Sequence, residues 1–243
     1  MTSQFIPVAF LLFLTLWRWT VAGPDSPSAE QTFDVAGEVK LFRAGSNAPL
    51  KDASRAVVWL SPQGAIQPAR LVTPAGKYRM IQHNKMFKPS LLVVPLGSLV
   101  DFPNLDPWFH NVFSLYRGKR FDLGLYEAGA QKTIKFDRPG ASYIFCNIHP
   151  EMAAVVLTVD SNFYAISDKS GRVSIAHVPR GKYLLRAWYE NTDSRSLDAL
   201  TRPVEIDRNN DSLLSLTIPV TEEKSPKHKN KYGRNYDPKV TEY

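Results

Sequence analysis

The sequence has only one cysteine, Cys146, in its 243 residues. A single cysteine cannot form a disulfide within the chain, so a covalent staple of the fold is excluded. The roles that remain for its sulfur are a buried thiol, a bridge to another chain, or a metal ligand. Because an unprotected thiol is easily oxidised outside the cytoplasm, export of this chain would favour the ligand role.

The N-terminus lacks any Lys or Arg before its apolar run, Phe5–Trp17. That run is too short to span a bilayer, and the small residues Thr20 and Ala22 are typical of cleavage near Ala22–Gly23. We therefore expect residues 1–22 to be a signal peptide and the mature protein to be secreted, in the periplasm, without a stable membrane span. Because a basic n-region is absent, an uncleaved anchor is the alternative.

Between Asp34 and Val220 the sequence lacks an amphipathic repeat of helical length, and the stretch SLDAL would make at most one turn. Short apolar runs rich in Val, Tyr, Phe and Trp follow one another instead, divided by turn residues such as PLGS, RPGA, DKSG and PRG. This density of short strands is typical of β-sandwiches, so we expect an all-β protein. The runs are VAGEVKLF, AVVWL, SLLVVPL, SLVDF, ASYIF, AAVVLTV, YLLRAWY and LLSLTI.

The basic residues lack a concentrated block within this central part, although the net charge is +7. Scattered Lys and Arg together with expected export argue against a nucleic-acid partner. A basic surface would still favour encounter with an acidic partner. The end of the chain, SPKHKNKYGRNYDPKVTEY, has few aliphatic and many charged residues, so we expect 221–243 to be a basic, flexible tail.

The stretch FCNIHPEM spaces Cys146, His149 and Met152 three residues apart. Period-two alternation in ASYIFC puts Ser142 and Ile144 on the same strand face as Cys146, at the end of that strand. A short loop after this strand could aim a thiolate, an imidazole and a thioether at one point, and His110 in WFHNVF could supply a second imidazole. Two histidines, a cysteine and a weak axial methionine are the ligand set of a blue-copper electron-transfer site.

Other kinds of site fit this set of residues less well. Zinc usually recruits four Cys, His or carboxylate ligands and rarely methionine, and the C-x-x-C-H motif of covalent haem is absent. A Cys–His nucleophile pair is possible, although a histidine in a tight loop favours chelation over base duty. Taken singly, each of these residues has an ordinary structural role, and only their combination favours a ligand set.

With these motifs in view, residues from about 77 to 160 resemble the cupredoxins, and most closely the amicyanin and pseudoazurin branch. The resemblance lies in MFKPSLLVVPLGSLVDFPNLD, in the HNV that starts at His110, and in FDRPGASYIFCNIHPEM with its short Cys-x₂-His-x₂-Met loop. It implies one copper ion per chain, held by His110, Cys146, His149 and Met152. It also implies that Asn111 hydrogen-bonds across the ligand loops.

The rest of the chain resembles a carboxypeptidase-regulatory-like, or prealbumin-type, β-domain. VAGEVKLFRAGSNAPLKDASRAVVWLSP resembles its opening and YAISDKSGRVSIAHVPRGKYLLRAWYE its second half. We therefore expect a Greek-key cupredoxin sandwich over 63–160 inserted into a smaller, discontinuous β-sandwich made of 34–62 and 161–220. Two consecutive units are the alternative, with 34–62 packed directly on the cupredoxin.

These features predict an exported mononuclear copper protein that carries single electrons and is not an enzyme. Pro107, Trp108, Phe109 and Pro150 would form an apolar docking patch around His149, for a redox partner such as an exported cytochrome or dehydrogenase. His83, His177 and His228 are expected to be structural or surface residues. The alternatives are a copper-handling protein, which usually has Met- or His-rich tracts that this sequence lacks, and a structural β-module without a redox role.

Overall fold

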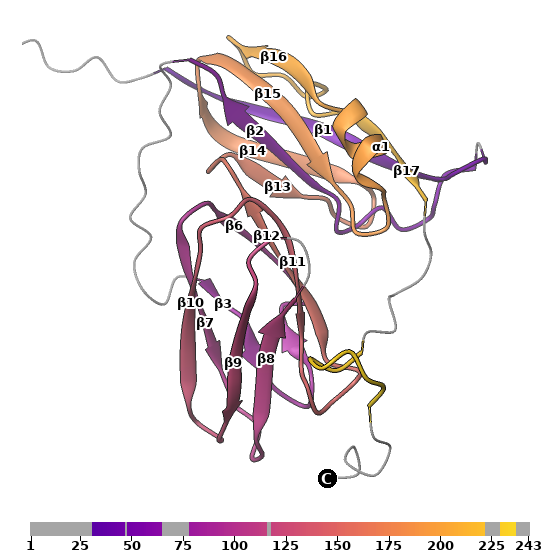
Figure 1. Cartoon of the computed structure of the whole chain (residues 1–243). Helices are drawn as coiled ribbons and strands as arrows, with labels where there is room; N and C mark the ends of the chain where they lie inside the picture. Colours follow the sequence, from indigo (N-terminus) through magenta and orange to yellow (C-terminus); the bar gives the residue numbers. More distant parts are fainter. Residues whose placement is uncertain (1–30, 47, 65–77, 116–117, 222–228, 237–243) are drawn as a thin grey trace, which may run out of the picture. The chain divides into compact units, whose positions relative to one another are not determined.

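The computed structural model describes residues 31–46, 48–64, 78–115, 118–221 and 229–236 (Figure 1). Regular structure in these ranges is almost entirely β, with a single short helix among the described residues. The predicted all-β sandwich fold class is therefore confirmed. The predicted signal peptide, 1–22, lies outside the described residues.

One sandwich contains all four residues of the predicted ligand set. A five-stranded sheet in the order β6-β12-β11-β8-β9 and a three-stranded sheet in the order β10-β7-β3 both contribute to its core. Strands β4 and β5 form a separate pair. The bounds are β3 (Tyr78–Arg79), β4 (Ile81–Gln82), β5 (Phe87–Lys88), β6 (Leu91–Pro95), β7 (Ser98–Pro103), β8 (His110–Ser114), β9 (Phe121–Tyr126), β10 (Gln131–Phe136), β11 (Gly140–Phe145) and β12 (Ala153–Val159).

Alternation along β11 builds the part of this core that lies next to the site. Ser142, Ile144 and Cys146 are all fully buried, so the predicted shared face is confirmed. Phe102 and Phe136, from the facing sheet, belong to the same fully buried cluster as Ile144. Full burial of side chains of this size stabilises a fold by about 1.5–3 kcal/mol each.

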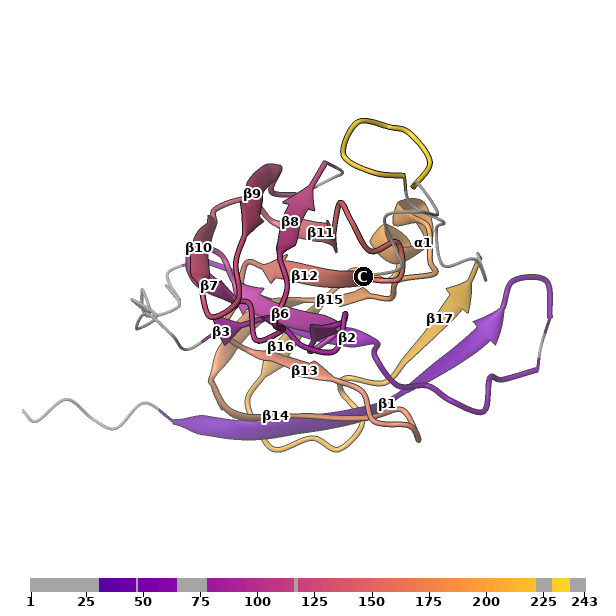
Figure 2. The ribbon, with the colours of Figure 1, turned by 90° about the horizontal axis from the view of Figure 1, so that it is seen from below.

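Strand register brings the predicted ligands to one end of this sandwich. Strand β11 is antiparallel to both of its neighbours, with Phe145 opposite Phe113 of β8 and opposite Ala153 of β12 (Figure 1 and Figure 2). The first residue of β8 therefore lies near the residue that follows β11 and the residue that precedes β12. Those residues are His110, Cys146 and Met152.

The second sandwich combines strands from both sides of the first one in sequence. Its sheets run β14-β1-β17 and β13-β2-β15-β16, so β1 and β2 pair with strands from much later in the chain. This pairing is what a discontinuous unit requires, while membership of the carboxypeptidase-regulatory-like class stays a prediction. The bounds are β1 (Thr32–Arg43), β2 (Val57–Pro62), β13 (Tyr164–Ile166), β14 (Arg172–Pro179), β15 (Gly181–Trp188), β16 (Arg202–Ile206) and β17 (Leu216–Val220).

The described helix, α1 (Ser194–Ala199), lies in the connection between β15 and β16 and includes most of the stretch SLDAL. The Asp193 side chain caps it by accepting a hydrogen bond from the backbone N–H of Ser196 at 3.0 Å. At six residues it is slightly longer than the one turn expected from the sequence.

Candidate metal centre

The segment from Cys146 to Met152 is a closed loop between β11 and β12. The backbone N–H of Cys146 donates to the carbonyl oxygen of Met152 at 3.2 Å, and that of Met152 donates to the carbonyl oxygen of His149 at 3.1 Å. These two bonds fold the loop back on itself. The thiol, the second imidazole and the thioether of the predicted ligand set therefore belong to one short, internally bonded turn.

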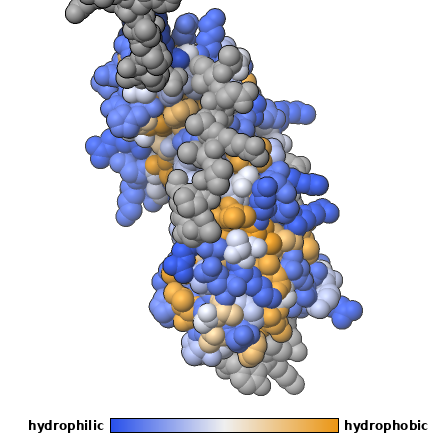
Figure 3. All heavy atoms as spheres, turned by 90° about the vertical axis from the view of Figure 1, so that its left-hand side faces the viewer, coloured by the Kyte–Doolittle hydropathy of each residue, from blue (hydrophilic) through white to orange (hydrophobic). Residues whose placement is uncertain are grey.

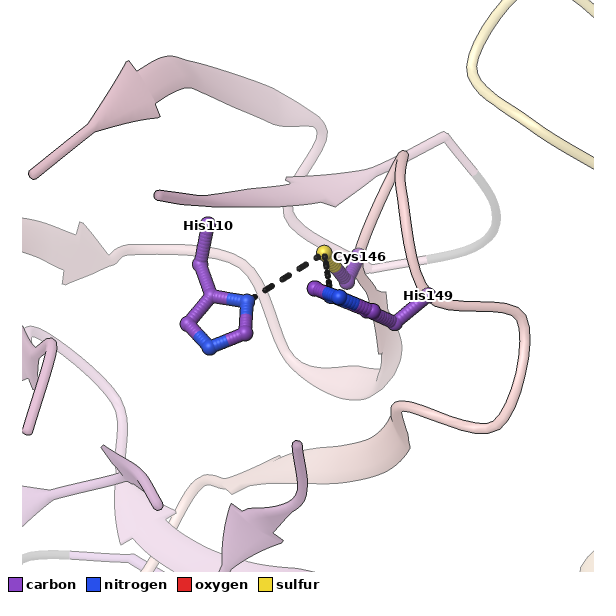
Figure 4. Close-up of side chains that lie close together, drawn as sticks. All are labelled: His110, Cys146 and His149. Atoms are coloured by element: carbon purple, nitrogen blue, oxygen red, sulfur yellow. Dashed lines mark hydrogen bonds between the residues drawn. The ribbon is translucent and has the colours of Figure 1, made fainter. Parts of the chain in front are cut away.

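Three of the four predicted ligands converge in the structure (Figure 4). The Cys146 Sγ atom lies 3.9 Å from Nδ1 of His110 and 3.7 Å from Nδ1 of His149. One donor atom from each of the three residues lies within 4.8 Å of the others. Two ligand atoms that share an ion through tetrahedral bonds of about 2.0 and 2.3 Å lie roughly 3.5 Å apart, so these separations fit a common metal ion.

All four side chains of the predicted ligand set are buried away from water. His110, Cys146 and Met152 are fully buried and His149 is only 3 % exposed. A buried imidazole is costly unless its polar atoms have partners, and here the two imidazoles and the thiol face one another. The arrangement is therefore a dry, convergent set of nitrogen and sulfur atoms.

Burial raises the pKa of the Cys146 thiol above its ordinary value, although three backbone N–H groups act in the opposite direction. These N–H groups belong to Asn111, Ile148 and His149, and hydrogen bonds from them favour a negatively charged sulfur. The thiol is thus protonated in the metal-free protein at neutral pH. Its sulfur already faces the backbone N–H groups that would stabilise a thiolate. Metal binding would release that proton.

A carboxylate orients the His110 ring. The Oδ2 atom of Asp106 lies 2.7 Å from Nε2 of His110, and both side chains are almost completely buried. Burial alone would raise the pKa of Asp106, but hydrogen bonds from the backbone of Lys85, the ring of His110 and the backbone of Asn84 hold it below its ordinary value. An ionised Asp106 places the ring proton on Nε2 and leaves the lone pair of Nδ1 toward Cys146.

Asp106 was not among the predicted site residues. The available signal was a carboxylate only four residues before His110, because a histidine ligand usually donates its other ring N–H to a carboxylate, a backbone carbonyl or water. His83, expected to be a surface residue, also lies near this carboxylate. Its Nδ1 atom is 3.8 Å from Oδ1 of Asp106, and its side chain is 46 % exposed.

His149 is held as a neutral imidazole. Its pKa is lowered from the ordinary value first by burial and next by the neighbouring His110. The two rings lie with their centroids 4.9 Å apart at an interplanar angle of 66°. A neutral ring offers the lone pair that metal coordination needs, so no proton has to leave His149 before an ion can bind at neutral pH.

Met152 lies in the same hydrophobic cluster as Cys146, at the closing end of the ligand loop. Its complete burial in this cluster agrees with an axial thioether or with an ordinary core side chain. The role of Met152 as fourth ligand stays a prediction that substitution can test.

Asn111 lies beside the site, with its side chain turned toward β9. Its amide nitrogen donates to Oδ1 of Asp122 at 2.7 Å, whereas the resemblance implied a bond across the ligand loops. The contact of Asn111 with the ligand loop is made by its backbone N–H, directed at the Cys146 sulfur. Asp122 also accepts a hydrogen bond from the backbone N–H of Gly124 at 2.9 Å.

The four residues of the predicted docking patch are all exposed, and two of them, Trp108 and Phe109, directly precede His110. The ammonium group of Lys85 lies 5.4 Å from the centre of the Trp108 ring. Two further exposed hydrophobic residues lie nearby in sequence: Met86 in the β4–β5 turn next to Lys85, and Leu105 in the β7–β8 loop that contains Trp108. Figure 3 shows hydrophobic atoms in several patches on another view of the molecule, so exposure alone does not identify a docking surface.

Comparison with known proteins gives no family model and no curated protein that matches this sequence. Solved structures do match parts of the chain. A purple cupredoxin from Nitrosopumilus maritimus is 22% identical, covers 34% of this chain and 99% of its own length, and has a TM-score of 0.31. A reduced Cu(I) form of an amicyanin variant is 18% identical over 42% of this chain and 98% of its own, with a TM-score of 0.33.

A Cu-containing nitrite reductase from Thermus scotoductus is also 22% identical over 34% of this chain. The match covers only 22% of the reductase chain, with a TM-score of 0.33. Among the described residues, no helix has both the length and the apolar character needed to cross a membrane.

Proposed function

We propose that this protein holds one copper ion at His110, Cys146, His149 and Met152 and carries single electrons. The observation that supports the proposal most strongly is the convergence of a buried thiol and two imidazole nitrogens within 4.8 Å of one another. No other group of three or more His, Cys, Asp or Glu side chains in the described part of the chain gathers in this way.

The chemistry of the donor set favours copper over other metals. A thiolate and a thioether are soft ligands that suit Cu(I), whereas imidazoles also accommodate Cu(II). Calcium and magnesium require oxygen ligands, and a structural zinc site would need a better fourth donor than methionine. A bound copper ion would supply reversible one-electron oxidation and reduction at this point.

The surrounding residues would keep the donor geometry the same in both oxidation states. Asp106 fixes the orientation of the His110 ring, and the two backbone hydrogen bonds of the ligand loop fix Cys146 and Met152 relative to each other. Burial excludes water from all four side chains. A rigid, dry donor set suits electron transfer better than substrate binding, and so we propose a carrier and not an enzyme.

The proposal extends to location and partner. The expected signal peptide favours export to the periplasm, and the exposed loop residues around Trp108 would provide the apolar surface on which a redox protein docks. An exported cytochrome or dehydrogenase is the class of partner that this combination favours. Nothing in the charge pattern favours nucleic acid.

Titration of the purified protein with Cu(II) tests this function. The expected result is an intense visible absorption band from the thiolate bond at one copper per chain, which bleaches on reduction and returns on oxidation. A colourless copper complex would favour a copper-handling protein instead. Failure to take up copper would leave only a structural role.

Substitution of Met152 by leucine is expected to keep the visible band and raise the reduction potential, because loss of a weak axial donor disfavours Cu(II) more than Cu(I). Leu is close to Met in volume, so the metal-free protein should lose less than about 1.5 kcal/mol of unfolding free energy. Voltammetry and denaturant unfolding measure the two effects.

The matched control for this change is Met80→Leu, because Met80 is a fully buried methionine of the same hydrophobic cluster. It should have a similar effect on stability and leave the potential unchanged. Equal potentials in the Met152→Leu variant and the wild type would exclude Met152 as a ligand.

Substitution of Trp108 by lysine is expected to slow electron exchange between two copies of the protein about tenfold or more. The two copies would meet through the same patch, and like charges placed opposite each other in an interface cost several kcal/mol. Nuclear magnetic resonance line broadening in mixtures of reduced and oxidised protein measures this rate. Ile166→Lys is the control, because Ile166 is an exposed residue of β13 in the second sandwich. An unchanged rate after Trp108→Lys would remove the patch from the proposal.

A further inference from the structure

A short C-terminal segment, residues 229–236, lies against the ligand loop and is named here the C-terminal strap (gold in Figure 1). The Tyr236 hydroxyl donates to the carbonyl oxygen of Cys146 at 2.7 Å. The backbone N–H of Lys231 donates to Oδ1 of Asn147, the next residue of the loop, at 2.9 Å. The tail was expected to be flexible, but over these residues it is instead hydrogen-bonded to the ligand cysteine and its neighbour.

The strap also contacts β9, which pairs with β8, the strand that begins at His110. The ammonium group of Lys231 lies 2.8 Å from Oδ2 of Asp122, whose other oxygen accepts from the Asn111 side chain at 2.7 Å. This ion pair is partly shielded, since the two side chains are 22% and 36% exposed. The pKa of Lys231 is raised, first by its hydrogen bond to Asp122. Lys231 thus connects the Cys146 loop with the residue that follows His110.

The strap is organised by its own hydrogen bonds. The Asn230 side chain accepts from the backbone N–H groups of Tyr232 and Arg234, each at 3.0 Å. The backbone of Asn230 also pairs with Gly233 and Arg234. A segment with this internal turn loses less conformational freedom on docking than an open chain would, so a few hydrogen bonds suffice to hold it.

We propose that Tyr236 and Lys231 are positioning residues that fasten the ligand loop, so that the C-terminal strap determines how tightly the site retains its metal. This inference rests on the proposed copper function only for the identity of the metal. The strap holds the carbonyl group of the ligand cysteine itself, and it follows β17 of the other sandwich in the chain. Because coupling between two binding events is reciprocal, a bound metal must also hold the strap more firmly.

Hydrogen exchange of the metal-free, full-length protein tests the inference without copper. Tyr236→Phe removes one hydroxyl and keeps the ring. The backbone amides of residues 147–149 should then exchange about two- to tenfold faster, the factor that a net hydrogen bond contributes. Tyr183→Phe is the matched control, because it removes a hydroxyl that donates to a backbone carbonyl, that of Pro179, at 2.8 Å in the second sandwich. Equal exchange in the two variants would overturn the proposal.

Copper release to an excess of a competing chelator is the second measurement. Release from Tyr236→Phe and from Lys231→Met should be about two- to tenfold faster than release from Tyr183→Phe and the wild type, by the same hydrogen-bond factor. Equal release rates in all four proteins would contradict the strap's role while leaving the copper site intact. If the wild type takes up no copper, the copper assignment fails, and the metal-free exchange experiment still decides whether the strap fastens the loop.

Discussion

Replacement of Cys146 by serine is expected to abolish the intense visible band of the Cu(II)-loaded protein completely. That band requires a thiolate bound to copper, and Cys146 is the only cysteine of the chain. A serine hydroxyl is a hard donor that stays protonated at neutral pH, so it cannot replace the sulfur. The remaining imidazoles of His110 and His149 should still bind some Cu(II), which separates loss of colour from loss of all binding.

The fold should survive this substitution. Serine is close to cysteine in size, and its hydroxyl can accept hydrogen bonds from the backbone N–H groups that now face the sulfur. Denaturant unfolding of the metal-free variant checks this point, and Met152→Leu, which should stay coloured, provides the comparison. A Cys146→Ser protein that remains blue would show that the thiolate is not the source of the band.

Replacement of Asp106 by asparagine is expected to weaken copper binding about 10- to 100-fold, the usual effect of removing the partner that orients a histidine ligand. The carboxylate accepts from Nε2 of His110 and from the backbone N–H groups of Asn84 and Lys85. An amide keeps only one accepting oxygen and loses the negative charge. The ring of His110 would then be free to take the other tautomer, with its proton on the nitrogen that faces Cys146.

Competition with a chelator of known affinity measures this loss, and nitrogen resonances of the metal-free protein report the tautomer of His110. Asp101→Asn is the matched control, because Asp101 is a buried carboxylate on β7 that accepts from the Thr133 hydroxyl at 2.6 Å. It should lower stability without changing copper affinity. If both variants bind copper equally well, Asp106 is not the residue that orients the ligand.

The strands of the fold were largely predictable because their side chains signal burial locally. Each of the eight apolar runs noted in the sequence overlaps a strand, and two of those strands, β11 and β12, flank the ligand loop. Apart from β8, whose five residues are all buried, the strands without such runs have exposed or partly exposed residues. In β10, QKTIKF, partly covered and exposed residues alternate, and the exposed Lys135 interrupts the apolar pattern. Such a strand is specified by its neighbour β7, and that pairing is not visible in its own composition.

The ligand loop was predictable because its residues are close in sequence, and the structure brings His110, Cys146 and His149 together as predicted. The partners of those ligands depend on contacts between distant segments. Asp106 is held by the turn that contains Asn84 and Lys85. The C-terminal strap meets Cys146 from 90 residues away. A charged, aliphatic-poor tail gives no local signal for such docking, since it has few side chains to bury.

The central claim is that one copper ion lies between the sulfur of residue 146 and the Nδ1 atoms of residues 110 and 149. Diffraction from crystals grown with Cu(II), collected on both sides of the copper absorption edge, tests it most directly. We expect one anomalous peak per chain, at bonding distance from all three atoms. A peak at any other place, with no metal bound to the sulfur or to either imidazole, would contradict the account.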